Sequence, residues 1–119
     1  MITQLALYQK TYDLYHYTHL FVKQFPKSER FLVSLGLQSA LLEAIRFMVQ
    51  ANNRPDIADR RRLQEEAEAR YTIYATHLRL ARDLNLLPKA KYEHASLLLE
   101  EIERILGGWK KCQGLAGRE

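Results

Sequence analysis

Three breaks divide the chain into four apolar segments, and this division constrains its fold more than any other feature. The breaks lie at residues 25–29, 51–56 and 85–88, and each contains a proline. Proline lacks a backbone donor and disfavours a helical conformation in the residue before it, so helices are expected to end at each break. We therefore predict helices over residues 2–24, 28–51, 56–85 and 89–106.

Within each segment, apolar residues recur every three or four positions, which is the period of an amphipathic helix. On the third segment the stripe expected in the core is Leu63, Ala67, Tyr71, Tyr74, Leu78 and Ala81, and on the fourth it is Tyr92, Ala95, Leu99, Ile102 and Leu106. Short connections place consecutive helices side by side, so the predicted fold is all-α, an antiparallel up-down-up-down four-helix bundle. The bundle is expected to fill residues 1–106. Gly107 and Gly108 are expected to end the last helix and to begin a flexible tail over residues 107–119. Trp109 is expected to pack its ring on the bundle, and the alternative is that it contacts a partner.

The first two segments carry more apolar residues than one buried stripe requires. The stripes expected in the core are Leu5, Tyr8, Tyr12, Tyr15, His19 and Val22, and Phe31, Leu35, Gln38, Leu42, Ile45 and Val49. The surplus is costly to expose to water, at about 25 cal/mol per Å². We predict that it forms an oligomer interface made of Leu7, Leu14, Phe21, Leu37 and Leu41. The alternative is a single domain with a wide core.

Positive charge is concentrated at one end of the predicted bundle. The formal net charge is +4, with 18 Lys and Arg against 14 Asp and Glu. In this topology one end collects Lys23, Lys27, Arg30, Arg79, Arg82, Lys89 and Lys91. A cationic end attracts polyanions such as nucleic acid, and Lys110 and Lys111 near the C-terminus are further candidates. The alternative for any one of these residues is ordinary surface charge.

No residue pattern indicates a metal, a cofactor or an established catalytic set. Asp13, His16 and His19 share one helix side, but the other helices lack the matching Glu and Glu-x-x-His sets of a di-metal bundle. We therefore expect no metal site, no cofactor and no catalytic residues. The chain is predicted to be a binding protein and not an enzyme.

One weaker pattern points to RNA cleavage. Arg70 and His77 are separated by six residues, a spacing similar to that of the HEPN ribonucleases, in which histidine transfers a proton and arginine holds phosphate. The alternative is that Arg70 pairs with Glu66 and that His77 forms a polar edge of the core.

Compartment signals favour the cytoplasm. The single cysteine, Cys112, excludes an internal disulfide and is typical of a reducing environment. The first ten residues lack the basic and apolar regions of a signal peptide, and no stretch reaches about 18 consecutive apolar residues. We expect a cytoplasmic protein without a membrane partner.

Four segments together resemble the accessory variability determinant (Avd) proteins of diversity-generating retroelements, within a wider family that includes the ribosomal-RNA intervening-sequence proteins. The segments are YQKTYDL at 8–14, FPKSERF at 25–31, HLRLARDL at 77–84 and LGGWKK at 106–111. The first is shared across the wider family, whereas the Gly-Gly-Trp-Lys ending and the stretch NNRP at 52–55 favour Avd.

The resemblance implies a non-enzymatic, basic, barrel-like pentamer. Such a protein binds a reverse transcriptase together with RNA and DNA, as template RNA and cDNA, in mutagenic retrohoming. Arg79 and Arg82 match the basic third-helix segment and are the expected polymerase or nucleic-acid contacts. The alternative function is that of an intervening-sequence-type bundle, associated with RNA or the ribosome and without a polymerase partner.

Overall fold

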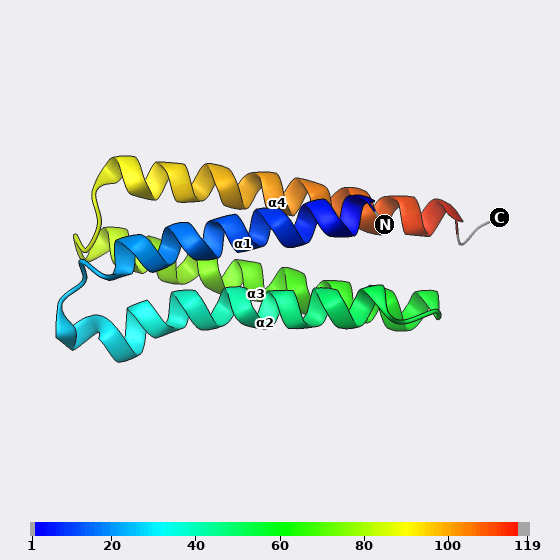
Figure 1. Cartoon of the computed structure of the whole chain (residues 1–119), viewed down its shortest axis with the longest axis horizontal. Helices are drawn as coiled ribbons and strands as arrows, with labels where there is room; N and C mark the ends of the chain where they lie inside the picture. The colour runs from blue at the N-terminus through cyan, green and yellow to red at the C-terminus, as the bar shows by residue number, and fades with distance from the viewer. Residues whose placement is uncertain (1, 117–119) are drawn as a thin grey trace.

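The computed structural model describes the backbone of residues 2–116 and the side chains of residues 3–112. Four antiparallel helices form a bundle of 52 × 24 × 20 Å (Figure 1). They are α1 (Ile2–Val22), α2 (Leu35–Asn52), α3 (Ile57–Asp83) and α4 (Lys89–Ala116), and no strand occurs in the described residues. A 3₁₀ turn η1 (Lys27–Glu29) and a π-helical turn η2 (Arg30–Ser34) join α1 to α2. The predicted all-α up-down-up-down bundle is confirmed.

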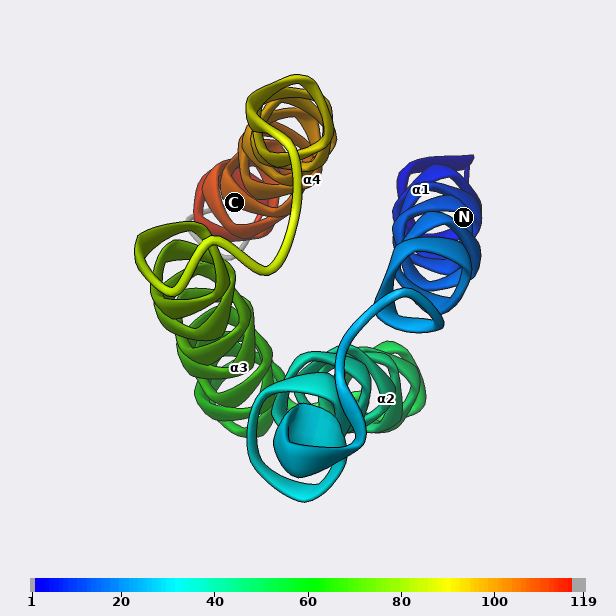
Figure 2. The ribbon, with the colours of Figure 1, turned by 90° about the vertical axis from the view of Figure 1, so that its left-hand side faces the viewer.

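Consecutive helices are neighbours in the end-on view (Figure 2). The first and last helices also contact each other: Lys10 Nζ lies 2.9 Å from Glu101 Oε1, and the rings of Tyr17 and His94 meet edge to face at 4.7 Å. The four helices therefore enclose a single core.

The predicted breaks coincide with the observed turns. α1 ends before Pro26, and α3 begins after Asp56, whose carboxylate accepts a hydrogen bond of 3.0 Å from the Asp59 backbone N–H. This contact satisfies one of the unpaired donors at the helix N-terminus. At the other end of α3, Asn85 adopts φ 59°, a left-handed conformation that asparagine tolerates better than most residues.

The core of α3 and α4 was predicted well. The stripe Leu63, Ala67, Tyr71, Tyr74, Leu78 and Ala81 is buried on α3, and Ala95, Leu99, Ile102 and Leu106 are buried on α4. Tyr92, the first residue of the predicted α4 stripe, is half-buried and packs against the core. Each of these helices offers a single apolar stripe, so periodicity identifies the inward face.

The assignment of stripes on the first two helices is wrong for most residues: of the predicted core stripes, Val22 is buried and Tyr15 and Ile45 pack partly against the core. The five residues predicted to form the oligomer interface are at most 2% exposed in this single chain: Leu7, Leu14, Phe21, Leu37 and Leu41. They belong to the core, as in the wide-core alternative. By contrast, Leu5 is 68% exposed and Phe31 80% exposed, although both were assigned to the core. Two apolar faces with the same period compete on these helices, and periodicity alone does not rank them.

Two hydrogen bonds cross the core diagonally from α1 to α3. The Thr11 hydroxyl donates to the Leu7 carbonyl at 2.8 Å, so it accepts from the Tyr71 hydroxyl at 2.7 Å. Thr18 repeats this arrangement with the Leu14 carbonyl and Tyr74, at 2.7 and 2.6 Å. Burial raises the pKa of Tyr71 to about 12 and also raises the pKa of Tyr74. Both hydroxyls are therefore neutral donors at physiological pH.

The last helix does not end at the glycine pair. α4 continues through Gly107 and Gly108 to Ala116, so the predicted boundary at residue 106 is wrong. Trp109 is 5% exposed, as expected of an anchor, and Arg61 Nη2 donates to the Lys110 carbonyl at 2.9 Å. Contacts with α3 therefore hold this last part of the helix despite the low helix propensity of glycine. Residues 117–119 of the predicted tail lie outside the described residues.

Two helical glycines are expected to respond oppositely to substitution by alanine. A Cβ on Gly36 of α2 would lie 2.6–2.8 Å from three ring atoms of His77, whereas a Cβ on Gly107 would meet nothing within 4 Å. Gly107→Ala should raise the free energy of unfolding by about 1 kcal/mol through helix propensity. Gly36→Ala should lower it by about 1–2 kcal/mol, because overpacking outweighs the same gain. Urea unfolding at a fixed protein concentration measures both changes. The double variant Gly36→Ala/His77→Ala should recover the loss, and stabilisation by Gly36→Ala alone would contradict the expectation.

One segment, Lys27–Asn52, is long and apolar enough to cross a membrane by length and composition. The core helix of a bundle can have the same composition. Here apolar residues occupy two sides of α2: Leu37, Leu41 and Met48 face the core, while Leu42 and Val49 are exposed. The hydropathy of this segment therefore reflects a second, uncovered apolar side.

Candidate nucleic-acid interface

Four chain segments meet at one end of the bundle and bring most of the predicted cations together. These segments are the end of α1, the turns η1 and η2, the end of α3 and the start of α4, all at the left of Figure 1. They carry the basic pole, defined as Lys23, Lys27, Arg30, Arg79, Arg82, Lys89 and Lys91. The acids in the same segments are Glu29, Asp83 and Glu93. The excess of four positive charges equals the formal charge of the whole chain.

Most cations of the basic pole have no acidic partner. Arg82 Nη2 lies 3.1 Å from Asp83 Oδ1, and Lys89 Nζ lies 3.8 Å from Glu93 Oε1. The Arg82 guanidinium also lies over the Tyr92 ring, 4.8 Å from its centroid. Within the described residues, the other five cations of the pole form no salt bridge. The Arg79 guanidinium is thus more available to bind an anion than that of Arg82. The sequence had predicted both arginines as contacts, without ranking them.

Lys110 and Lys111 lie on the last part of α4, at the opposite end of the bundle (Figure 1). Lys110 Nζ lies 3.5 Å from Glu68 Oε2, and its side chain is largely covered. Lys111 is exposed. The structure therefore does not bring these two lysines to the basic pole.

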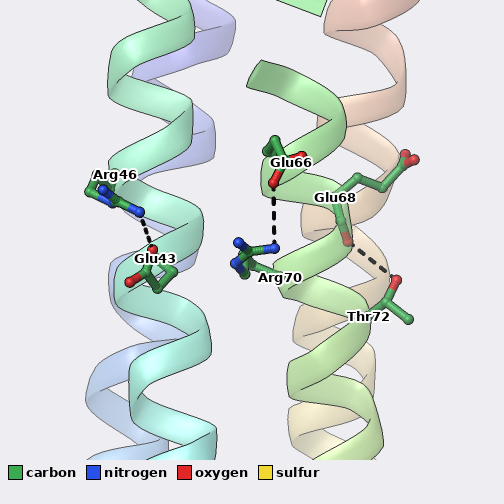
Figure 3. A network of polar contacts seen from close by, with 6 residues as sticks. All are labelled: Glu43, Arg46, Glu66, Glu68, Arg70 and Thr72. Carbon is green, nitrogen blue, oxygen red and sulfur yellow. Dashed lines mark hydrogen bonds and ion pairs between the residues drawn. The ribbon is translucent and has the colours of Figure 1, made fainter. Parts of the chain in front are cut away.

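In the middle of the bundle, by contrast, arginines are paired with glutamates (Figure 3). On α2, Arg46 Nη2 lies 2.6 Å from Glu43 Oε2, and on α3, Arg70 Nη1 lies 3.6 Å from Glu66 Oε2. Both guanidinium groups also lie over the Phe47 ring, at 4.7 and 5.0 Å from its centroid. Opposite charges thus cancel here, and cation–π contacts hold the two arginines.

The two residues with ribonuclease-like spacing have packing roles. Arg70 forms the contacts with Glu66 and Phe47, as in the non-catalytic alternative. The His77 ring packs against Gly36, and its buried Nδ1 has no hydrogen-bond partner in the described part of the chain. His77 is half-buried, so it forms a polar edge of the core.

The three residues considered for a metal site each contact a different partner. Asp13 accepts a hydrogen bond of 2.9 Å from Gln9, His16 stacks with Tyr12, and His19 Nδ1 lies 3.4 Å from Gln38 Oε1. Among the described residues, no group of three or more His, Cys, Asp or Glu side chains is arranged to hold a metal ion.

An exposed apolar surface follows α1 and α2. It was not predicted from the sequence, because its residues were assigned to the core. We define the outer α1/α2 face as Leu5, Tyr8, Tyr12, Leu42 and Val49, which are 44–68% exposed. Leu5, Tyr8 and Val49 line a cavity of about 220 Å³, and none of the described side chains in its lining is charged. Monomeric proteins rarely expose a large contiguous apolar patch, so such a face indicates an interaction surface.

Where the groove between α1 and α2 reaches the basic pole, its lining includes cations. There we define the basic pocket, of about 440 Å³, lined by His19, Val22, Lys23, Arg30, Phe31, Ser34, Leu35 and Gln38. It is an open groove in which two cations border exposed apolar side chains.

These features define a class: a small four-helix bundle with a cation-rich end and an uncovered apolar face. The model of the bAvd-like family matches residues 5–113, which is most of the chain, and the chain belongs to this family. The resemblance carried by the four sequence segments is thereby confirmed. Comparison with curated protein sequences gives no match.

Proposed function

We propose that this chain is the accessory protein of a diversity-generating retroelement, without catalytic activity of its own. It binds the reverse transcriptase of the element together with template RNA and cDNA, and it supports mutagenic retrohoming. The observation that carries this proposal is the basic pole, of which five cations form no salt bridge with any described residue, on a chain of the bAvd-like family.

Self-association is part of the proposal. Copies of the chain cover the outer α1/α2 face, which consists of exposed aliphatic and tyrosine side chains. The resemblance to Avd supports a pentamer. In a ring with rotational symmetry, equivalent ends of the subunits point the same way, so the basic poles gather on one side. Their summed field attracts a polyanion more strongly than one pole alone.

The experiment that tests the proposal is co-purification. The tagged chain is expressed with the reverse transcriptase and template RNA encoded beside it, and bound protein and RNA are measured after washing at moderate salt. We expect both to be retained. Retention of ribosomal RNA without the polymerase would instead support the intervening-sequence-type function, and retention of neither would overturn the proposal.

A further inference from the structure

The basic pocket combines an exposed aromatic ring with unpaired cations. Phe31 in η2 is 80% exposed, more than any other large hydrophobic side chain among the described residues. Lys23 and Arg30 line the same pocket, and neither forms a salt bridge in the described part of the chain. The pocket lining includes no Asp or Glu. An exposed ring beside unneutralised cations fits a ligand with a flat apolar surface and a negative charge.

Polar groups at the pocket have unused hydrogen-bonding capacity. Ser34 is 4% exposed, and its Oγ has no hydrogen-bond partner within the described residues. The contact between His19 Nδ1 and Gln38 Oε1 is long, at 3.4 Å, and Gln38 Nε2 donates to the Ser34 carbonyl at 3.2 Å. His19 Nε2 and the second N–H of the Gln38 amide remain for contacts with the edge of a nucleobase.

The local backbone presents these residues together. η2 is a π-helical turn, a conformation that is rare and often found at functional sites. Arg30, Phe31 and Ser34 belong to this turn, and Leu35 begins α2 directly after it. Lys23 approaches from the other side, just after the end of α1.

Charge separates this pocket from the outer α1/α2 face. The described residues that line the cavity at Leu5 and Val49 are uncharged, which suits the core of a protein–protein interface, where charged residues are depleted. Lys23 and Arg30 line the basic pocket, and burying them in a protein–protein interface without acidic partners would be costly. The same two cations favour an anionic ligand.

We propose that the basic pocket binds an unpaired nucleotide of single-stranded RNA or DNA. The base stacks on Phe31, and Lys23 and Arg30 hold the adjacent phosphates. Stacking on an aromatic side chain requires an unstacked base, so the pocket prefers single strands over duplexes. This inference rests on the proposed nucleic-acid binding and specifies its substrate class.

The test compares three labelled probes by fluorescence anisotropy: oligo(U), oligo(dT) and a blunt DNA duplex, each about 12 nucleotides or base pairs long. For Phe31→Ala we expect single-strand affinity to fall by about five- to hundredfold, because one stacking contact is lost. Duplex affinity should change less than about twofold, since the cations that contact phosphate remain. Phe31→Trp should restore single-strand binding. Equal loss with oligo(U) and oligo(dT) indicates a site shared by RNA and DNA, whereas loss with one alone assigns the pocket to that strand.

Leu97→Ala is the matched control, because Leu97 is 63% exposed on α4 and lies outside the pocket. It should bind all three probes as the unaltered chain does. Sedimentation of Phe31→Ala should show an unchanged oligomeric state. Unchanged single-strand binding, equal losses on single strands and duplex, or dissociation of the oligomer would each overturn the proposal. Failure of the unaltered chain to bind any probe would instead contradict the proposed function.

Discussion

Substituting glutamate for Tyr8 and Val49 together is expected to convert the proposed oligomer to monomers. These residues belong to the outer α1/α2 face on α1 and α2, and each is 44% exposed. An ionised carboxylate buried without a partner costs several kcal/mol, so two should weaken association at least about a thousandfold. Light scattering after size-exclusion chromatography measures the molar mass directly.

The control is Leu97→Glu, which adds one carboxylate at a more exposed site on α4, away from this face. We expect the control to keep the mass of the unaltered chain and all variants to retain helical circular dichroism. A Tyr8→Glu/Val49→Glu variant of unchanged mass would show that copies do not meet through this face.

Reversing two cations of the basic pole is expected to weaken nucleic-acid binding about a hundredfold near physiological salt. Lys27 and Arg79 are the appropriate sites, because both are exposed and neither has a salt bridge among the described residues. In Lys27→Glu/Arg79→Glu, two phosphate contacts are lost and two repulsive charges are gained. The slope of log K against log salt concentration should become shallower by about 2.

Arg54→Glu/Arg62→Glu makes the same charge change on exposed residues at the opposite end of the bundle. Binding titrations at several salt concentrations should leave this control within about threefold of the unaltered chain. Equal losses in both variants would mean that total charge, and not the basic pole, determines affinity.

The bundle and its charged end could be predicted from the sequence because each depends on short-range signals. Pro26, Pro55 and Pro88 mark the turns, and the order of helices then determines which cations share an end. The ion pair that holds Arg82 to Asp83 was not predicted, because side-chain conformations decide which neighbouring charges meet.

The inward faces of α1 and α2 could not be chosen from apolar period alone, because each helix has two such faces. Hydroxyl groups decide the choice on α1: Thr11 and Thr18 lie between Leu7, Leu14 and Phe21 and meet tyrosines of α3. The apolar period takes no account of these two hydroxyl groups. In the folded chain those hydroxyls satisfy the buried Tyr71 and Tyr74, which would otherwise lose a hydrogen bond.

The continuation of α4 was missed for a related reason. Gly107 and Gly108 have low helix propensity, and a glycine pair normally indicates a helix end. Packing of Trp109 and the bond from Arg61 to the Lys110 carbonyl override that local preference.

The two Thr–Tyr hydrogen bonds also determine how α1 is aligned along α3. The threonines are seven positions apart on α1, about 10.5 Å of rise, whereas the tyrosines are three positions apart on α3, about 4.5 Å. Sliding α1 along α3 by one turn, about 5.4 Å, would move both threonines out of hydrogen-bonding distance of their tyrosines. Because the two spacings are unequal, no larger shift places one threonine at the position of the other with respect to both tyrosines. The two hydrogen bonds together fix the position of α1 along the axis of α3. They thereby also fix where the surface side chains of α1 lie relative to those of the other helices.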